Sequence, residues 1–232
     1  RAPLSLVQRI EEIPGVDKIE TRVVAYVNLD VENFDDPISG HLISLPDNSR
    51  GLLNQIYLRE GRLMQPGRDN EIVLSEEFVR AHELQLGDKI SATINGRRKA
   101  LTIVGIALSP EYIYQIAPGA MFPDPLRYGI LWIARQPLAT AYDMEGAFNN
   151  VALTLVRGAN EQDVIDRLDD LLKDYGGIGT IGGGLCRFSG SCGQFNLVHG
   201  TTPCTFIQVY QQPIPDRADT PVATDERRSL RG

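Results

Sequence analysis

The chain has 232 residues, of which 42% are hydrophobic and 23% are charged, and its formal net charge is -7. This is the composition of a globular protein that can bury one large core or two small ones. The negative charge argues against a nucleic-acid partner, because proteins neutralise phosphates with a surplus of Lys and Arg. No stretch approaches the roughly 18 consecutive apolar residues that a membrane helix needs.

The start of the chain predicts a helix followed by a long strand. Residues 3–13 carry apolar side chains at helical spacing, and Pro14-Gly15 ends the run. Residues 19–31 alternate between apolar and polar side chains, which predicts a half-buried strand. Its polar face carries Glu20, Arg22, Asn28 and Asp30. A shorter strand follows at 41–46, and the order of these elements is typical of an α+β arrangement.

The middle of the chain reads as a compact β-rich module with one short helix. Residues 71–75 predict a strand that ends at Ser75, a residue type that caps the helix predicted for 76–84. Asn95-Gly96 lies between two strand-like runs and predicts a hairpin, because both residues tolerate positive φ. A Pro-rich stretch with several aromatic residues follows, and residues 129–134 predict one more strand.

The body of the chain closes with a strand at 149–156 and a helix at 160–175. Asn160 is placed to cap this helix, and Gly176-Gly177 to end it. Its apolar stripe consists of Val164, Ile165, Leu168, Leu171, Leu172 and Tyr175.

These elements predict an α+β fold with a discontinuous first domain. Residues 1–50 and 145–181 would form one α/β-sandwich-like subdomain, and residues 51–144 a small β-rich module inserted between its halves. In this arrangement, the strand around Val23–Val31 shares a sheet with the strand around Val151–Val156. The apolar stripes of the first and last helices would then pack on the same face of that sheet.

The remaining residues, 182–232, show neither helical nor strand periodicity and predict an irregular tail, for which we predict no function. This tail contains all three cysteines of the chain, Cys186, Cys192 and Cys204, together with His199. A Cys3His zinc site is one interpretation, although the tight Cys-x2-Cys pair is absent. A disulfide is the alternative if the tail folds outside the cytoplasm.

No motif in the sequence points to chemistry. Residues 177–182, "GIGTIG", match the dinucleotide fingerprint in letters, but they follow a helix and open none, so we interpret them as the end of that helix. His41 and His82 stand alone, and no G-x-x-x-x-G-K-[ST] motif is present. We therefore expect no catalytic, cofactor-binding or metal-binding residues, no cofactor and no enzyme activity.

Three ordered segments resemble a known family. They are "IPGVDKIETRVVAYVNLDV" (13–31), "YLREGRLMQPGRDNEIVLSEEFVRAHELQLGDKISATINGRRKALTIVGIALSPEYIY" (57–114) and "NNVALTLVRGANEQDVIDRLDDLLKDYGG" (149–177). In this order they resemble the extracytoplasmic, or periplasmic, core domain of MacB/FtsX-like ABC transporter permeases, and the likeness covers residues 1–181. The tail departs from that pattern, because the family would run into a second membrane helix there.

The resemblance implies a domain that couples ATP hydrolysis in the cytoplasm to export or mechanotransmission outside the membrane. It implies a place on the periplasmic or extracellular side of the bacterial inner membrane, between membrane helices, and the chain, which begins at Arg1, would be a piece of the permease. The implied partners are an ABC-type ATP-binding subunit, a second permease copy and a periplasmic adaptor or lipoprotein, with no nucleic acid. The alternative is a free-standing extracytoplasmic binding or adaptor module with the same fold.

Overall fold

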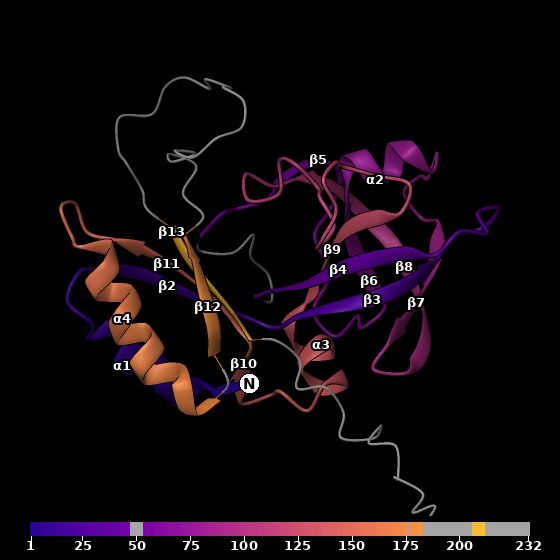
Figure 1. Ribbon diagram of the computed structural model, residues 1–232. Helices are drawn as coiled ribbons and strands as arrows, with labels where there is room; N and C mark the ends of the chain where they lie inside the picture. The colour runs from indigo at the N-terminus through magenta and orange to yellow at the C-terminus, as the bar shows by residue number, and fades with distance from the viewer. Residues whose placement is uncertain (47–52, 176, 183–205, 212–232) are drawn as a thin grey trace, which may run out of the picture.

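The structure is a computed structural model that describes residues 1–46, 53–175, 177–182 and 206–211 (Figure 1). The described strands form one sheet of four strands, one of seven strands, and a short pair between β1 (Ala2–Pro3) and β10 (Ala147–Phe148). Figure 1 shows the four-stranded and seven-stranded sheets side by side. We call the four-stranded sheet with its two helices the small lobe, and the seven-stranded sheet with its helices the large lobe. The mixture of helices and strands confirms an α+β fold.

The small lobe is an antiparallel sheet covered by helices. Its strands, in spatial order, are β12 (Gly177–Gly182), β13 (Phe206–Gln211), β11 (Asn150–Leu155) and β2 (Val16–Arg22). The helical elements are the 3-10 turn η1 (Leu4–Leu6) with α1 (Val7–Glu11), and α4 (Glu161–Leu172) with the 3-10 turn η2 (Lys173–Tyr175).

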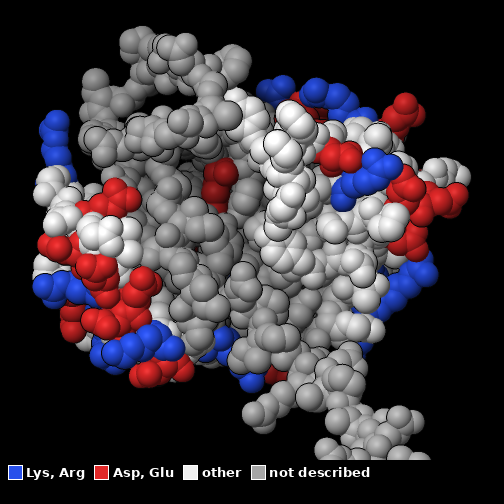
Figure 2. All heavy atoms as spheres, in the orientation of Figure 1, with Lys and Arg blue, Asp and Glu red and all other residues white. Residues whose placement is uncertain are grey.

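One apolar core holds the small lobe together. Both predicted helix stripes contribute to it, and the buried members are Ala2, Leu6, Ile10, Ile13, Phe148, Val151, Leu153, Val164, Leu168 and Leu172. The prediction that the first and last helices share one core is confirmed. Asn160 caps α4 as predicted, since its Oδ1 accepts a hydrogen bond from the backbone N of Gln162 at 3.1 Å. The opposite face of α4 is densely charged and faces solvent (Figure 2).

The large lobe is a sheet that closes on itself. Its strands run in the order β5 (Tyr57–Gly61), β8 (Arg97–Leu108), β6 (Glu71–Ser75), β9 (Tyr128–Ala134), β4 (Ile38–Leu45), β3 (Val24–Asp30) and β7 (Lys89–Ile94). Because β7 also pairs with β8, six of the strands form a closed barrel, and β5 extends β8 on the outside. The large lobe also contains α2 (Glu76–Ala81) and α3 (Arg135–Ala141).

Strand β9 shows why this barrel has two apolar cores. Leu131 and Ile133 belong to the core that also receives Phe78 of α2, whereas Ile130 and Trp132 belong to a second core on the opposite face. All residues of β9 are buried, as expected of a strand with both faces covered. The predicted hairpin is confirmed, since Asn95 and Gly96 have φ of 46° and 73°.

The long strand predicted for residues 19–31 is two strands that belong to different sheets. β2 pairs with β11 as expected, but β3 pairs with β4 and β7 of the large lobe. The prediction that the strand around Val23–Val31 shares a sheet with the strand around Val151–Val156 is therefore wrong. Residues 16–22 pair with β11 instead, because the chain leaves one sheet at Val23 and enters the other. The domain limits at 50 and 145 stay a prediction, and the change of sheet offers Val23 as another limit.

Three further expectations are corrected. Residues 177–182 are strand β12 and not the end of a helix, and residues 206–211, inside the tail predicted to be irregular, are strand β13 between β11 and β12. Both segments contain β-branched residues, which favour strands. Ser75 occupies the position before α2 but makes no capping hydrogen bond; its hydroxyl donates to Gln115 Oε1 at 2.8 Å.

Candidate functional site

The two lobes meet where the chain crosses between them twice. The first crossing is Val23, the single residue between β2 and β3. The second is at Phe148–Asn149, because Ala147 packs against the large-lobe core whereas Phe148 belongs to the small-lobe core. The two crossings lie side by side, since the backbone N of Asn149 donates to the O of Arg22 at 3.2 Å. We call this region the interlobe junction and include in it Glu20, Arg22, Val23, Ser44, Leu53, Glu111, Arg135 and Asn149.

The Asn149 side chain takes the place of a strand partner for Val24. Its Oδ1 accepts from the backbone N of Val24 at 2.8 Å, and its Nδ2 donates to the O of Val24 at 2.7 Å. Ser44 does the same for Val23: the Ser44 hydroxyl accepts from Val23 N at 2.8 Å, and Ser44 N donates to Val23 O at 2.9 Å. The backbone groups at the change of sheet are therefore all paired, as buried polar groups must be.

Arg135, the first residue of α3, joins the two crossings from the large lobe. One guanidinium nitrogen donates to the O of Thr21 at 2.6 Å, and the other donates to the O of Ala147 at 3.1 Å. Thr21 precedes the first crossing and Ala147 precedes the second. One rigid planar group thus fixes the spacing of both segments.

A buried ion network centred on Arg22 completes the interlobe junction. Its Nε donates to Glu20 at 2.7 Å, its Nη1 donates to Glu111 at 2.6 Å, and its Nη2 donates to the backbone O of Leu53 at 3.2 Å. The side chains of Arg22 and Glu20 are each only 4% exposed. Glu20 also accepts from Leu53 N at 2.9 Å, so two charged side chains of the small lobe hold both backbone polar groups of Leu53 in the large lobe.

The charges in this network compensate one another. Burial alone would lower the pKa of Arg22, but the neighbouring carboxylates of Glu111 and Glu20 outweigh it and raise the pKa above its ordinary value. The guanidinium is therefore always charged, and its donors are directed to three different acceptors. Such a network positions the backbone segments that it joins.

The sequence gives only a weak signal for this site. Glu20 and Arg22 alternate with apolar residues and were expected on the polar, solvent side of a strand, whereas both are buried. Their partner Glu111 lies 89 positions away in the chain, and no local pattern predicts that separation. The one available hint is that two opposite charges at i and i+2 share a strand face.

The two histidines predicted to be isolated are packed side chains. His41 of β4 stacks on Tyr26 with ring centroids 4.7 Å apart and meets the edge of Tyr112. Its Nε2 makes no hydrogen bond with any residue that the structure describes. Burial, with a smaller contribution from Arg22, lowers its pKa to about 4, so His41 is neutral at pH 7.

His82 lies on the other side of the large lobe, and it packs against Phe78 and Phe34. Its Nε2 lies 3.0 Å from the backbone O of Leu126. Burial lowers the pKa of His82. Cys186, Cys192, His199 and Cys204 lie outside the described residues, so both the zinc and the disulfide interpretation stay predictions.

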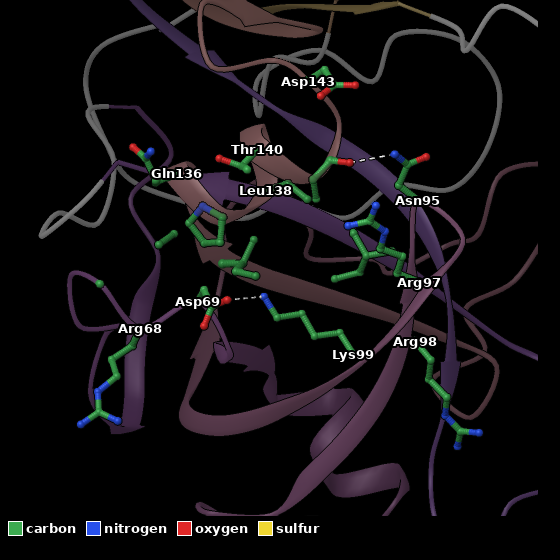
Figure 3. A pocket seen from close by; sticks show the side chains of 16 residues that line it. Arg68, Asp69, Asn95, Arg97, Arg98, Lys99, Gln136, Leu138, Thr140 and Asp143 are labelled. Carbon is green, nitrogen blue, oxygen red and sulfur yellow. Dashed lines mark hydrogen bonds and ion pairs between the residues drawn. The ribbon is translucent and has the colours of Figure 1, made fainter.

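An open groove of about 920 Å³ lies between the turn at 67–69, the β7–β8 hairpin and α3 (Figure 3). Lys99 crosses it and pairs with Asp69 at 2.9 Å, and Asn95 Nδ2 donates to the O of Ala141 at 2.8 Å. In Figure 3 Arg68 and Arg98 extend to opposite sides, away from Lys99, so the cationic side chains do not converge on one point.

Within the described parts of the chain, no group of three or more His, Cys, Asp or Glu side chains could hold a metal ion. Over the same residues, none of the helices combines the length and the apolar character needed to cross a membrane.

Comparison with solved structures gives likeness of fold at low identity. The chain is 13% identical to the extracellular domain of the ABC-type transporter YknZ from Gram-positive bacteria, over 72% of this chain and 82% of that one, with a TM-score of 0.43. It is 13% identical to the periplasmic region of MacB from Actinobacillus actinomycetemcomitans, over 75% and 74% of the two chains, with a TM-score of 0.44.

A third similar structure is a domain of a putative permease protein from Porphyromonas gingivalis. It is 14% identical, over 75% of each chain, with a TM-score of 0.43. The YknZ structure is an extracellular domain and the MacB structure a periplasmic region, whereas the third is described only as a permease domain. No protein-family model matches the chain, and the comparison with curated proteins gives no significant match.

Proposed function

We propose that this chain is the extracytoplasmic domain of an ABC transporter permease and that it transmits movement from the membrane to a site outside it. The energy would come from ATP hydrolysed by a separate cytoplasmic ATP-binding subunit. The domain would lie on the periplasmic or extracellular side of a bacterial inner membrane. In this role the interlobe junction carries force between the lobes and carries out no chemistry.

The observation that carries the proposal is the way the small lobe is built. Residues from both ends of the body, α1 with β2 and β11 with α4, form its single core. Chain segments that entered and left this lobe through membrane helices would therefore act on one rigid body. Within the described residues, the chain passes between that body and the large lobe near Val23 and Asn149, and Arg1 adds hydrogen bonds to the O of Tyr142 and of Asp143. Movement would therefore reach the large lobe mainly through the interlobe junction.

The interlobe junction suits the transmission of force, because its bonds are directional. Hydrogen bonds weaken steeply when donor and acceptor lose alignment, whereas apolar contacts tolerate sliding. Arg22, Arg135 and Asn149 each bond to two segments or more. Rotation of one lobe against the other would break several of these bonds together.

A free-standing extracytoplasmic binding or adaptor module remains the second candidate. Its support is the open groove between the β7–β8 hairpin and α3. A module of this kind would need neither flanking membrane helices nor an ATP-binding subunit, and the coding sequence on either side of this segment discriminates the two candidates.

The test places the complete protein and its ATP-binding subunit in lipid nanodiscs. A donor dye is attached through Arg80→Cys, an exposed position of α2, after Cys186, Cys192 and Cys204 are changed to Ser. The acceptor dye is attached to lipid headgroups. We expect energy transfer to change between the nucleotide-free state and the state trapped with ATP and vanadate, because the large lobe moves relative to the bilayer.

Two variants test whether the movement passes through the interlobe junction. Arg22→Met should abolish the ATP-dependent change in energy transfer while ATP hydrolysis continues. Arg98→Met, which removes an exposed ion pair with Asp30, is the matched control and should leave the change intact. An unaltered protein whose large lobe does not respond to ATP would contradict the proposed function.

A further inference from the structure

The loop between β8 and β9 exposes several large apolar side chains to solvent. From Tyr112 to Pro123 it contains no charged residue. Met121 is 83% exposed, Phe122 75% and Tyr114 64%, and Ile113 and Ile116 are exposed as well. Contiguous exposed apolar side chains on a globular protein mark an interaction site. We call residues 112–123 the apolar loop.

Buried contacts on the protein side of the apolar loop hold it in place. Glu111, immediately before it, accepts hydrogen bonds from Arg22 at 2.6 Å and from Asn54 at 3.0 Å. Within the loop, Gln115 is buried and accepts from the hydroxyl of Ser75 at 2.8 Å, and Tyr112 packs edge-on against His41. The exposed side chains therefore stand on an ordered frame, which reduces the conformational entropy lost on binding.

The charges beside the loop are predominantly acidic. At its end, Asp124 pairs with Arg127 at 3.2 Å, and the same guanidinium pairs with Asp36. Asp36 belongs to the exposed turn after β3, which also carries Glu32 and Asp35. The turn contacts the loop end through His82, which packs on Phe34 and lies 3.0 Å from the O of Leu126. Two carboxylates, those of Asp124 and Asp36, thus pair with one guanidinium, and Glu32 and Asp35 add negative charge to the same turn.

The acidic side chains beside the apolar loop favour a protein partner over an anionic membrane. An anionic membrane surface attracts loops flanked by Lys and Arg, and acidic flanks oppose that attraction. A protein groove with an apolar floor and a basic rim complements both the apolar side chains and the carboxylates. Figure 2 shows that the visible face of the large lobe includes a broad area without charged side chains.

We propose that the apolar loop docks into an apolar, basic-rimmed groove of a partner protein, with Met121 and Phe122 as the anchoring side chains. Aromatic anchors at the centre of an interface carry a large share of the binding energy. This docking proposal does not depend on the transport role, because the apolar loop is exposed under either candidate function. Docking there would also act on the interlobe junction, since Glu111 links the loop directly to Arg22.

The experiment uses the full-length protein in its own cells. The photoreactive amino acid p-benzoylphenylalanine replaces Phe122 in one version and Val156 in the control version, because Val156 is an exposed apolar residue of the small lobe. After irradiation, the adducts are separated and identified by mass spectrometry. We expect a discrete adduct with a second protein from position 122 and none from position 156.

The identified protein is then purified and its affinity for the chain is measured. Met121→Ser combined with Phe122→Ser should weaken binding about tenfold or more, whereas Val156→Ser should leave it unchanged. Asp35→Lys should also weaken it, since the partner's rim is basic. Both loop side chains are exposed, so the double variant should retain the folded state.

Three results would overturn the proposal. An adduct formed only with lipid would identify a membrane-binding loop, and an adduct with a second copy of the chain would identify self-association. Equal adduct yields from positions 122 and 156 would show that the loop has no specific partner. Failure of the large lobe to respond to ATP leaves all of these readouts unaffected, so the two proposals are tested separately.

Discussion

Removal of the Arg22 guanidinium should destabilise the protein far more than removal of an exposed arginine. Arg22→Met keeps the apolar volume of the side chain but leaves Glu20 and Glu111 buried without their shared cation. The side chains of Glu20 and Glu111 are 4% and 10% exposed, so water cannot replace the lost charge. Removal of one partner of a buried ion pair lowers the free energy of unfolding by about 3–5 kcal/mol.

The matched control is Arg80→Met on α2. Arg80 pairs with Glu76 at 3.1 Å in an i,i+4 arrangement, and its side chain is 75% exposed. Exposed helix pairs of this kind contribute about 0.3–0.5 kcal/mol. The two substitutions are chemically identical, so the difference between them measures the effect of burial and of the second carboxylate.

Urea unfolding of the purified chain measures both values. Trp132, the single tryptophan, is buried in β9 and reports the large lobe by fluorescence, whereas far-UV circular dichroism reports the helices of both lobes together. The triple variant Glu20→Gln, Arg22→Met, Glu111→Gln should recover part of the loss, because no uncompensated charge remains. Equal losses from Arg22→Met and Arg80→Met would refute the role of the network in stability.

Three other predictions concern the cores and pH. Leu168→Asp places a charge in the small-lobe core and should lower the free energy of unfolding, measured with urea, by several kcal/mol. Arg167→Asp on the exposed face of the same helix should change that free energy little. Gly96→Val forces a β-branched residue to a φ of 73° and should destabilise the β7–β8 hairpin by about 1–2 kcal/mol. Hydrogen exchange should then rise in that hairpin and stay unchanged in α4; equal rises would contradict separate lobes. The pKa of His41 is lowered from 6.5 to about 4 in the fold, so the unfolded chain binds a proton first and stability should decline as pH falls from about 6.5 to about 4. His41→Phe should reduce that decline in urea unfolding followed as a function of pH, with the remainder due to His82, whose pKa is also lowered by burial. An unchanged profile would assign the decline to groups other than His41.

The local elements were predictable because their signals are local. The stripe of α4, its Asn160 cap and the Asn95-Gly96 turn each depend on residues within one or two turns of the chain. Strand β9 was also predicted, because a run of buried apolar residues bounded by loops reads as a strand. These features required no knowledge of distant contacts.

The change of sheet at Val23 could not be predicted, because alternation continues through it. Periodicity of two residues reports that a strand has two faces and carries no information about its neighbours. The same alternation placed Glu20 and Arg22 on the solvent side, whereas contacts from Leu53 and Glu111 bury them. Strand β13 was missed for a related reason: its six residues are surrounded by segments without periodicity, and its partners lie far away in the sequence.

The buried charges at the interlobe junction constrain the orientation of the two lobes relative to each other. A packed apolar interface of similar volume would often be equally stable or more stable, so stability alone does not account for the network. The Arg22 fork satisfies Glu20, Glu111 and Leu53 in three directions, and a rotation of the lobes that improved one bond would misalign another. The apolar loop begins immediately after Glu111, which accepts a hydrogen bond from Arg22 at 2.6 Å. The same guanidinium therefore contributes both to the contacts between the lobes and to the frame that supports the apolar loop.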